Sequence, residues 1–340
     1  MKNIAFLLGG FQGNGGIGRV TSILINNLQQ KGKYRIHAIS YVRDNRDLLY
    51  DIDDSIIQYA LFSSPRSMTK AIIIDNAVFR LRKYIKENNI DIIIACGALF
   101  YPVSILAVIG TGCDCYCWEH INPATTSDYK FQGIARKFAL RFAKKIIVLT
   151  KSAEKYYLDT LKCKKEKLVQ IYNPTLENNY EKEYDVKSKK IIVVGRLSKQ
   201  KNYGCVIKLA SMLKNDYPEW IWDIYGAGEL KEEIENQIVE NELGNNIRMM
   251  GQVNNMYERY PNYSFMVMTS LYEGFPMALL EGMSSALPLV SFDIETGPNE
   301  IIEDGINGYL VEPFDIDKMY QRIISLIKDD KKRMEFSDNS

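Results

Sequence analysis

The sequence predicts an α/β fold with two Rossmann-like domains that face each other across a cleft. Apolar, β-rich runs alternate with amphipathic stretches along the chain, as is typical of parallel sheets covered by helices. A length of 340 residues corresponds to about two domains of ordinary size. The alternation is interrupted at the polar stretch 174–190, PTLENNYEKEYDVKSKK, which is poor in core residues and is the best linker candidate.

The first domain, residues 1–173, is predicted to form a parallel sheet. Its candidate strands are the apolar runs 3–8, 34–41, 56–61, 91–96, 114–118, 146–149 and 168–171, with helices between them. Ligands of open parallel sheets bind beyond the carboxyl ends of the strands, so functional residues are expected in the loops that follow them.

The second domain, residues 191–340, repeats this rhythm. Its candidate strands are 191–195, 221–225, 247–250, 265–268, 288–291 and 308–311, and a helix is predicted near 315–329. The chain stops soon after that helix, at KRMEFSDNS.

The composition is that of a globular protein of a reducing compartment. No apolar run approaches the ~18–20 residues of a membrane span. The N-terminal MKNIAFLLGG leads into a glycine turn without a small-residue cleavage site, so we interpret it as the first strand of a cytoplasmic protein. Cys-x-Cys-x-Cys at 113–117 has the two-residue period of a strand face, not the usual spacing of zinc ligands, and buried free thiols are expected.

The two halves carry opposite charges. Residues 1–173 contain 25 Lys and Arg against 14 Asp and Glu, a net charge of +11, whereas residues 174–340 contain 18 against 28, a net charge of −10. The first half is therefore expected to face an anionic partner. No nucleic-acid reader motif is present, so nucleic acid is not expected. Peripheral binding to the inner face of the cell membrane is a hypothesis that fits the positive charge.

One basic segment offers a means of membrane attachment. Residues 130–145, KFQGIARKFALRFAKK, interleave six cations with Phe131, Ile134, Phe138 and Phe142. This is either a helix that packs its phenylalanines into the domain core or a helix at an anionic membrane surface, and both can hold because the cations remain free when the apolar stripe is buried.

Residues 13–19, GNGGIGR, fit the dinucleotide pattern G-x-G-x-x-G. Two observations weaken a nicotinamide interpretation. Gly13 lies five residues beyond the end of the first strand at Leu8, and the position about 20 residues past the glycines, where an acidic ribose ligand belongs, is Ala38.

Two stretches of the second half carry chemistry. In SLYEGFPMALLEGMSSALPLV, 270–290, Glu273 lies in a loop, Pro276 can occupy the first helical position, and Glu281 lies more than one turn into the helix. Backbone N–H groups of residues 275–278 can meet an anion. In GRLSKQKN, 195–202, Arg196 and Lys201 follow a strand and can clamp a diphosphate.

The ordered set of motifs resembles family 4 of the retaining glycosyltransferases, which use nucleotide sugars on a GT-B fold. The resemblance covers nearly the whole chain, with GGIGR at 15–19, WEH at 118–120, GRLSKQKN at 195–202, YGAGEL at 225–230, MGQV at 250–253, EGFPMALLE at 273–281 and TGPNEII at 296–302. Members usually finish with a long helix that crosses back onto the first domain, and from the resemblance we expect this helix to be missing or truncated here.

The resemblance implies roles for individual residues. It places Arg196 and Lys201 on the diphosphate and Glu281 on the nucleotide ribose. The remaining positions are Glu273, Gly274, Phe275, Pro276 and Met277 at the donor sugar, Gly251, Gln252 and Val253 near the base, Gly16 with its backbone near the phosphates, and His120 at the donor sugar and reaction centre. Glu119 is either a supporting residue behind His120 or a surface residue.

No metal or cofactor is expected. Asp51-Ile-Asp53 and Asp315-Ile-Asp317 match the Asp-x-Asp pattern by which other glycosyltransferases hold a divalent ion, but such triplets are common by chance and neither follows a strong strand run. Solvated loop carboxylates are favoured, since Arg196 and Lys201 supply positive charge at the diphosphate.

The sequence thus predicts a retaining, metal-independent transferase. The predicted reaction moves a hexose or N-acetylhexosamine from a UDP-sugar to a saccharide acceptor in surface polysaccharide or glycoconjugate synthesis, and the acceptor is expected to be lipid-linked. A sugar-nucleotide epimerase of the same fold, a non-catalytic sugar-nucleotide binder and a nicotinamide oxidoreductase are the alternatives.

Overall fold

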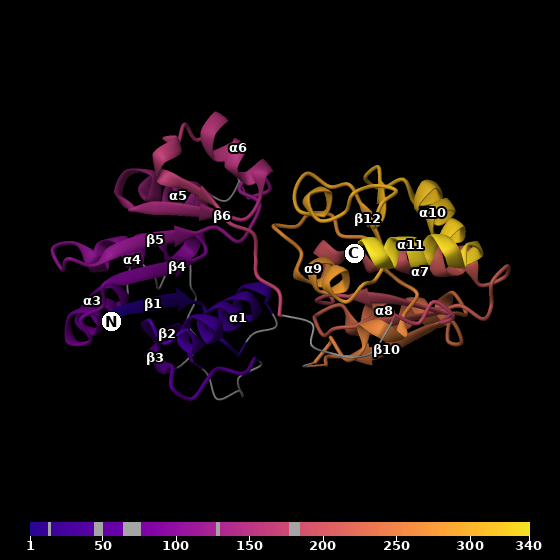
Figure 1. Ribbon diagram of the computed structural model, residues 1–340, viewed down its shortest axis with the longest axis horizontal. Helices are drawn as coiled ribbons and strands as arrows, with labels where there is room; N and C mark the ends of the chain where they lie inside the picture. The colour runs from indigo at the N-terminus through magenta and orange to yellow at the C-terminus, as the bar shows by residue number, and fades with distance from the viewer. Residues whose placement is uncertain (13–14, 44–49, 64–75, 127–129, 177–183, 254) are drawn as a thin grey trace. The chain divides into compact units, whose positions relative to one another are not determined.

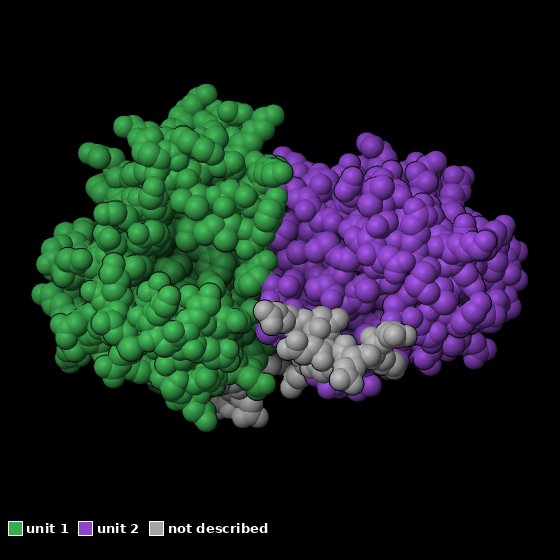
Figure 2. All heavy atoms as spheres, viewed as in Figure 1, with its two compact units in different colours: residues 1–174 green, residues 175–340 purple. Residues whose placement is uncertain are grey.

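The chain forms two compact units in a computed structural model, Met1–Pro174 and Thr175–Ser340 (Figure 1, Figure 2). The structure describes residues 1–340 except 13–14, 44–49, 64–75, 127–129, 177–183 and 254. Gly13 of the glycine turn and part of the predicted linker therefore lie outside the described residues. Each unit has its own core of buried apolar side chains.

Unit 1 is built on a seven-stranded parallel sheet with the order β3-β2-β1-β4-β5-β6-β7. The strands are β1 (Lys2–Leu8), β2 (Tyr34–Val42), β3 (Ile57–Phe62), β4 (Ile92–Cys96), β5 (Asp114–Trp118), β6 (Lys145–Val148) and β7 (Leu168–Gln170). The longer helices described are α1 (Gly16–Gln30), α3 (Ala77–Glu87), α4 (Tyr101–Val108), α5 (Lys130–Phe142) and α6 (Lys151–Asp159).

Helices α3, α4, α5 and α6 pack on one face of this sheet. Their buried residues belong to a single core cluster, to which Leu81, Ile85, Val103, Ile105, Ala135, Ala139, Ala153 and Tyr157 contribute. The buried residues of α1 do not join that cluster. This arrangement follows from right-handed crossovers. The step from β1 to β2 runs toward one edge of the sheet and the step from β4 to β5 runs toward the other edge, so the helices of these two crossovers cover opposite faces.

Unit 2 is built on a six-stranded parallel sheet with the order β10-β9-β8-β11-β12-β13. The strands are β8 (Lys190–Val194), β9 (Ile221–Tyr225), β10 (Ile247–Gly251), β11 (Phe265–Met268), β12 (Leu289–Phe292) and β13 (Gly308–Val311). The longer helices are α7 (Tyr203–Leu213), α8 (Lys231–Glu240), α9 (Met277–Ser284), α10 (Ile316–Lys328) and α11 (Asp330–Asn339).

The fold class is the predicted one, with two Rossmann-like α/β domains. Each of the thirteen strands expected from the sequence occurs with ends within one residue of the predicted ends. The six cysteines are free and buried, as predicted. No helix within the described residues is long and apolar enough to cross a bilayer.

Two features of the unit 2 helices differ from the expectation. Helix α9 begins at Met277, so Pro276 precedes the helix instead of opening it. Helix α11 was not predicted, because it has few apolar residues and no clear apolar stripe. It nevertheless places Phe336 in the core of unit 2.

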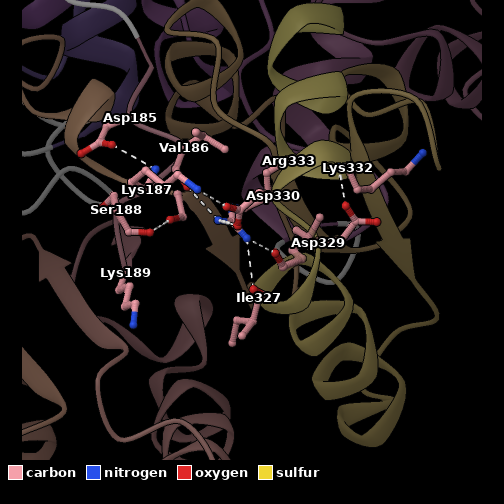
Figure 3. A network of polar contacts seen from close by, with 12 residues as sticks. Asp185, Val186, Lys187, Ser188, Lys189, Ile327, Asp329, Asp330, Lys332 and Arg333 are labelled. Carbon is pink, nitrogen blue, oxygen red and sulfur yellow. Dashed lines mark hydrogen bonds and ion pairs between the residues drawn. The ribbon is translucent and has the colours of Figure 1, made fainter.

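Arg333 fastens α11 to the beginning of unit 2 (Figure 3). Its buried guanidinium donates to the carbonyl of Val186 at 2.7 Å and to the Asp330 carboxylate at 2.6 Å. It also donates to the carbonyls of Leu326 and, at 3.2 Å, of Ile327. These carbonyls lie at the end of α10, so one side chain satisfies the end of one helix and holds the next.

We expect Arg333→Met to lower the free energy of unfolding by about 1.5–3 kcal/mol, because several buried carbonyls lose a charged donor. Urea denaturation followed by circular dichroism measures this loss. Lys187→Met is the control, since its ion pair with Asp330 is exposed and is worth about 1 kcal/mol or less. Equal losses in the two variants would contradict the assignment of Arg333 as the main fastening residue.

Candidate active site

The loops after β8 and β11 carry the charged residues that the sequence analysis singled out in unit 2. The two strands are adjacent and parallel, and the sheet extends from β8 to one side and from β11 to the other. Open α/β sheets bind ligands at such a switch point, beyond the carboxyl ends of the strands. Arg196 and Lys201 follow β8, and Glu273 follows β11 ahead of α9. The topology therefore brings them to one end of one sheet.

An ion pair between Lys201 and Glu273 joins the two loops. Lys201 Nζ donates to Glu273 Oε1 at 2.6 Å, and the side chains are only 17% and 9% exposed. Gln200 strengthens this junction, because its Nε2 donates to the Tyr272 carbonyl at 2.8 Å and its own carbonyl accepts from the Leu271 N–H at 2.8 Å. The ammonium group is thus held in place before any ligand arrives.

The backbone of the β8 loop is fixed by a close approach of the loop after β9. Gly226 has a φ of +151°, and a Cβ on it would lie 1.9 Å from the Gly195 carbonyl oxygen. The Leu197 N–H donates to the Ala227 carbonyl at 3.0 Å. Only glycine fits at position 226, which explains the first glycine in YGAGEL.

Arg196 lies on this loop, and its exposed side chain makes a weak ion pair that a ligand can replace. Its side chain is 61% exposed, and Nη2 lies 3.5 Å from Glu229 Oε2. An exposed pair of this kind contributes little to stability. The guanidinium can therefore leave Glu229 for a diphosphate at low cost.

Glu281 is buried on α9, one turn after the helix start. Its Oε2 accepts from the Tyr260 hydroxyl at 2.8 Å, which fixes the carboxylate. The helix lies close to β11, because a Cβ on Gly282 would lie 2.9 Å from Met266 Cε. The Tyr260 hydrogen bond and the close packing of α9 on β11 therefore fix the position of the Glu281 carboxylate.

The loop after β12 supports the segment Glu273, Gly274, Phe275, Pro276. The Thr296 hydroxyl donates to the carbonyl of Glu273. A Cβ on Gly297, whose φ is +100°, would lie 2.5 Å from Pro276 Cδ. The loop that precedes α9 and Met277 therefore packs against residues of the TGPNEII stretch.

Gly251 is the last residue of β10, and Gln252 and Val253 follow it beyond the carboxyl end of the strand. Gly251 has a φ of +70°, and its carbonyl accepts from the Gly226 N–H at 2.8 Å. Gly251 and Gln252 are exposed and Val253 is half-buried, so this edge is open to a ligand. Gln200 and Tyr260 hold predicted residues in place but are not among the residues expected from the sequence. A polar side chain one residue before Lys201 is a local signal for Gln200, whereas no local signal indicates Tyr260.

In unit 1 the switch point lies between β1 and β4. Gly16 is the first residue of α1, which begins beyond the end of β1, and it is exposed. The first N–H groups of a helix have no partner within the helix and favour anions. The structure thus places Gly16 where a phosphate can be met, although Gly13 is outside the described residues.

His120 follows β5, the neighbour of β4. Its ring centroid lies 4.2 Å from that of Trp118. Nε2 is buried and has no hydrogen-bond partner among the described residues. Burial lowers the pKa of His120 from 6.5 to about 3, so the imidazole is neutral near pH 7 and has one polar nitrogen to offer to a ligand.

Glu119 is not a surface residue, which corrects one of the two interpretations left open by the sequence. Its Oε2 accepts from Arg136 Nε at 2.7 Å and from the Tyr157 hydroxyl at 2.9 Å, and the charged side chains are both 2% exposed. Arg136 also donates to the Thr126 hydroxyl at 2.8 Å. This network ties α5 and α6 to the residue beside His120.

Two family models together span almost the whole chain. The model described as Glycosyltransferase Family 4 matches residues 14–175, and the model described as Glycosyl transferases group 1 matches residues 177–340. The O-antigen biosynthesis glycosyltransferase WbnH of Escherichia coli is 30% identical over 251 residues, which are 72% of this chain and 70% of WbnH. The chain belongs to the family 4 glycosyltransferases.

Other relatives match this glycosyltransferase over nearly their full lengths. An uncharacterized glycosyltransferase of Haemophilus influenzae is 26% identical over all of this chain and 94% of its own length. The N-acetylgalactosamine-N,N'-diacetylbacillosaminyl-diphospho-undecaprenol 4-alpha-N-acetylgalactosaminyltransferase of Campylobacter jejuni is 26% identical over 96% of this chain and 91% of its own. A crystal structure of a Staphylococcus aureus TarM variant in complex with fondaparinux, alpha-GlcNAc-glycerol and UDP has a TM-score of 0.81 at 18% identity and covers 99% of this chain and 95% of that one, which shows a common fold.

One aspartate of each Asp-x-Asp triplet in the glycosyltransferase accepts local hydrogen bonds. Asp53 accepts from the N–H and hydroxyl of Ser55 in an exposed turn. Asp315 is the N-cap of α10 and accepts from the Lys318 N–H at 2.9 Å. Within the described ranges no three His, Cys, Asp or Glu side chains cluster as metal ligands do.

Acid is expected to destabilise the enzyme through its two buried histidines. Burial and Arg35 lower the pKa of His37 to about 4, and burial lowers that of His120 to about 3. The unfolded chain takes up these protons below about pH 6.5, whereas the folded chain takes them up only near pH 4 and pH 3, so the free energy of unfolding falls as pH decreases from about 7 toward these folded-state values. Urea denaturation at several pH values measures the slope.

His37→Gln and His120→Gln should each reduce that slope, because each removes one proton from the unfolded-state uptake. Full retention of the wild-type slope in both variants would show that the histidines are not its source.

Proposed function

We propose that this glycosyltransferase transfers a hexose or N-acetylhexosamine from a UDP-sugar to a lipid-linked saccharide, with retention of anomeric configuration and without a metal ion. Unit 2 binds the donor and unit 1 binds mainly the acceptor. The product belongs to a surface polysaccharide or glycoconjugate, which agrees with the O-antigen role in the name of the E. coli relative. The enzyme works at the inner face of the cell membrane.

The observation that carries the proposal is the charged group around the ends of β8 and β11. Lys201 is fixed by Glu273 at 2.6 Å, and Arg196 on the same loop is exposed. A fixed ammonium and a guanidinium that can turn suit a diphosphate, whose charge rises when it becomes a leaving group. The buried Glu281 carboxylate supplies the acceptor that ribose hydroxyls need.

The two cations are the reason for proposing a metal-independent reaction. They can neutralise the leaving UDP, which is the task that a divalent ion performs in other diphosphate chemistry. Asp53 and Asp315 are engaged in turn and cap hydrogen bonds, which agrees with this proposal.

Names of similar proteins support the donor and the acceptor. The TarM variant was crystallised with UDP, and the C. jejuni relative is named for transfer to a diphospho-undecaprenol-linked sugar and for an α-linkage. Transfer from an α-configured nucleotide sugar into an α-linkage is retention.

His120 has a positioning task in this proposal. Its neutral imidazole presents a buried Nε2 without a partner among the described residues, which suits a hydrogen bond to a sugar hydroxyl. The leaving diphosphate accepts the proton of the acceptor hydroxyl on the face from which it departs. A histidine of pKa about 3 is therefore not needed as the base.

Labelled UDP-sugars, offered with and without a lipid-diphosphate saccharide, separate this function from its alternatives. A transferase gives UDP and an extended acceptor in equal amounts. An epimerase changes the donor sugar whether or not acceptor is present, and a binder gives no product; either result would refute the proposal.

We expect Arg196→Ala to weaken UDP binding by about 10- to 100-fold, the value of one charge-assisted hydrogen bond. Isothermal titration calorimetry measures it. Lys199→Ala is a matched control, because Lys199 is an exposed cation three residues away on the same loop. Unchanged affinity in Arg196→Ala, or equal losses in the two variants, would remove Arg196 from the diphosphate site.

The anomeric configuration of the first product tests retention. Proton NMR of the initial product from a UDP-α-sugar should show the small H1–H2 coupling of an α-linkage. A β-linked first product would overturn the retaining assignment while leaving the transferase function intact.

A further inference from the structure

We propose that the outer face of helices α3, α4 and α5 in unit 1 docks on a bilayer that contains anionic lipids. This membrane-docking face is formed by the exposed residues of these three helices. The inference rests on the proposed function in one respect, since a lipid-linked acceptor requires the enzyme to work at a membrane surface.

The three helices form one continuous layer. Helix α4 packs between α3 and α5, and all three cover the same face of the sheet. Arg82 of α3 links two of them, because its Nη1 donates to the Ala107 carbonyl at 3.2 Å and to the Ile109 carbonyl. Their outer sides therefore belong to one surface.

Large apolar side chains stand out from this surface. Helix α3 buries Leu81, Tyr84 and Ile85, and Phe79 points to the opposite side of the helix with 73% of it exposed. Ile109 at the end of α4 is 58% exposed, and Leu106 is also exposed.

Helix α5 repeats this arrangement. It buries Ala135, Arg136 and Ala139, while Ile134 on the outer side is 64% exposed. Phe142 at its end is exposed as well. The expected phenylalanine stripe into the core is therefore only partial, because Phe131 and Phe138 are half-buried against the core and small residues make the close contact.

The charged side chains that these three helices expose are almost all positive. Arg136 is buried in its pair with Glu119 and takes no part. The cations of the three helices that reach the surface are Arg80, Arg82, Lys83, Lys86, Lys130, Lys137 and Arg141. Against them stands one acidic residue, Glu87, whose Oε1 lies 3.7 Å from Lys83 Nζ.

This combination fits a lipid surface better than a folded protein partner. Single apolar side chains separated by cations can enter the acyl boundary while the cations meet anionic headgroups. Helix α4 contains no charged residue, so it can approach the bilayer between its two basic neighbours. A protein interface of comparable size has a contiguous apolar centre with the charges confined to its rim.

Sedimentation with vesicles tests the docking face. The full chain is mixed with vesicles of phosphatidylcholine alone or of phosphatidylcholine with phosphatidylglycerol. We expect binding to the mixed vesicles, little binding to the neutral ones, and release by salt, because the cations act through screened attraction.

Two variants test the residues. Phe79→Ser with Ile134→Ser removes apolar insertion, and Lys137→Glu with Arg141→Glu reverses charge; each pair should weaken vesicle binding by at least about tenfold. Val239→Ser is the matched control, because Val239 is 76% exposed on α8 of unit 2, and it should bind vesicles as the wild type does.

UDP affinity and unfolding midpoints measured on the same preparations show that each variant is folded. Folded docking-face variants that bind mixed vesicles as tightly as the wild type, or a wild type that binds both kinds of vesicle equally or neither, would overturn the docking face. Failure of the transferase assay with intact vesicle binding would overturn the proposed function and leave the docking face standing.

Discussion

The Lys201–Glu273 ion pair is the contact on which the candidate site of unit 2 depends. It connects the loop after β8 with the loop after β11, at the point where the strand order of the sheet reverses. A largely buried pair costs desolvation free energy and by itself stabilises a fold little. Its value here is positional, because it fixes an ammonium and a carboxylate at a place where a strongly anionic ligand can be bound. Gln200 and Thr296 hold the two loops from either side, so the pair stays in register when the exposed Arg196 turns toward a ligand.

Ion pairs of a carboxylate with a basic side chain also occur elsewhere in the fold. Glu119 and Arg136 are paired in the interior of unit 1 beside His120, and Asp223 accepts two bonds from Arg248 at 2.6 and 2.7 Å between β9 and β10. In each of these two pairs a carboxylate meets a guanidinium, whose planar fork fixes the direction of both groups. The pair of Glu119 with Arg136 fixes the loop that follows β5, whereas the pair of Asp223 with Arg248 joins two neighbouring strands.

The strands could be predicted from the sequence because their signal is local. Runs such as residues 191–194 are buried on both faces, so apolar composition alone locates them. The loop residues Arg196, Lys201 and Glu273 could be predicted from their place after such strands, together with the family resemblance. The partners could not, because Tyr260 lies 21 residues from Glu281 and Glu119 lies 17 residues from Arg136, distances at which sequence spacing carries no geometric information. Helix α11 could not be predicted for a related reason. Its own apolar periodicity is weak, and tertiary contacts of Arg333 and Phe336 stabilise it.

Helix α5 has two tasks that place opposite demands on its two sides. Its inner side is built from small residues and Arg136, which brings it close to the sheet and bonds it to Glu119 next to His120. Its outer side carries Ile134, Lys137 and Arg141, which have no role in that packing and remain exposed. A helix whose core contact rests on alanines is less firmly set by apolar area than one that buries leucines, so the buried ion pair does much to define its rotation. The orientation of the outer residues toward a surface and the placement of the loop at His120 are therefore fixed by the same guanidinium.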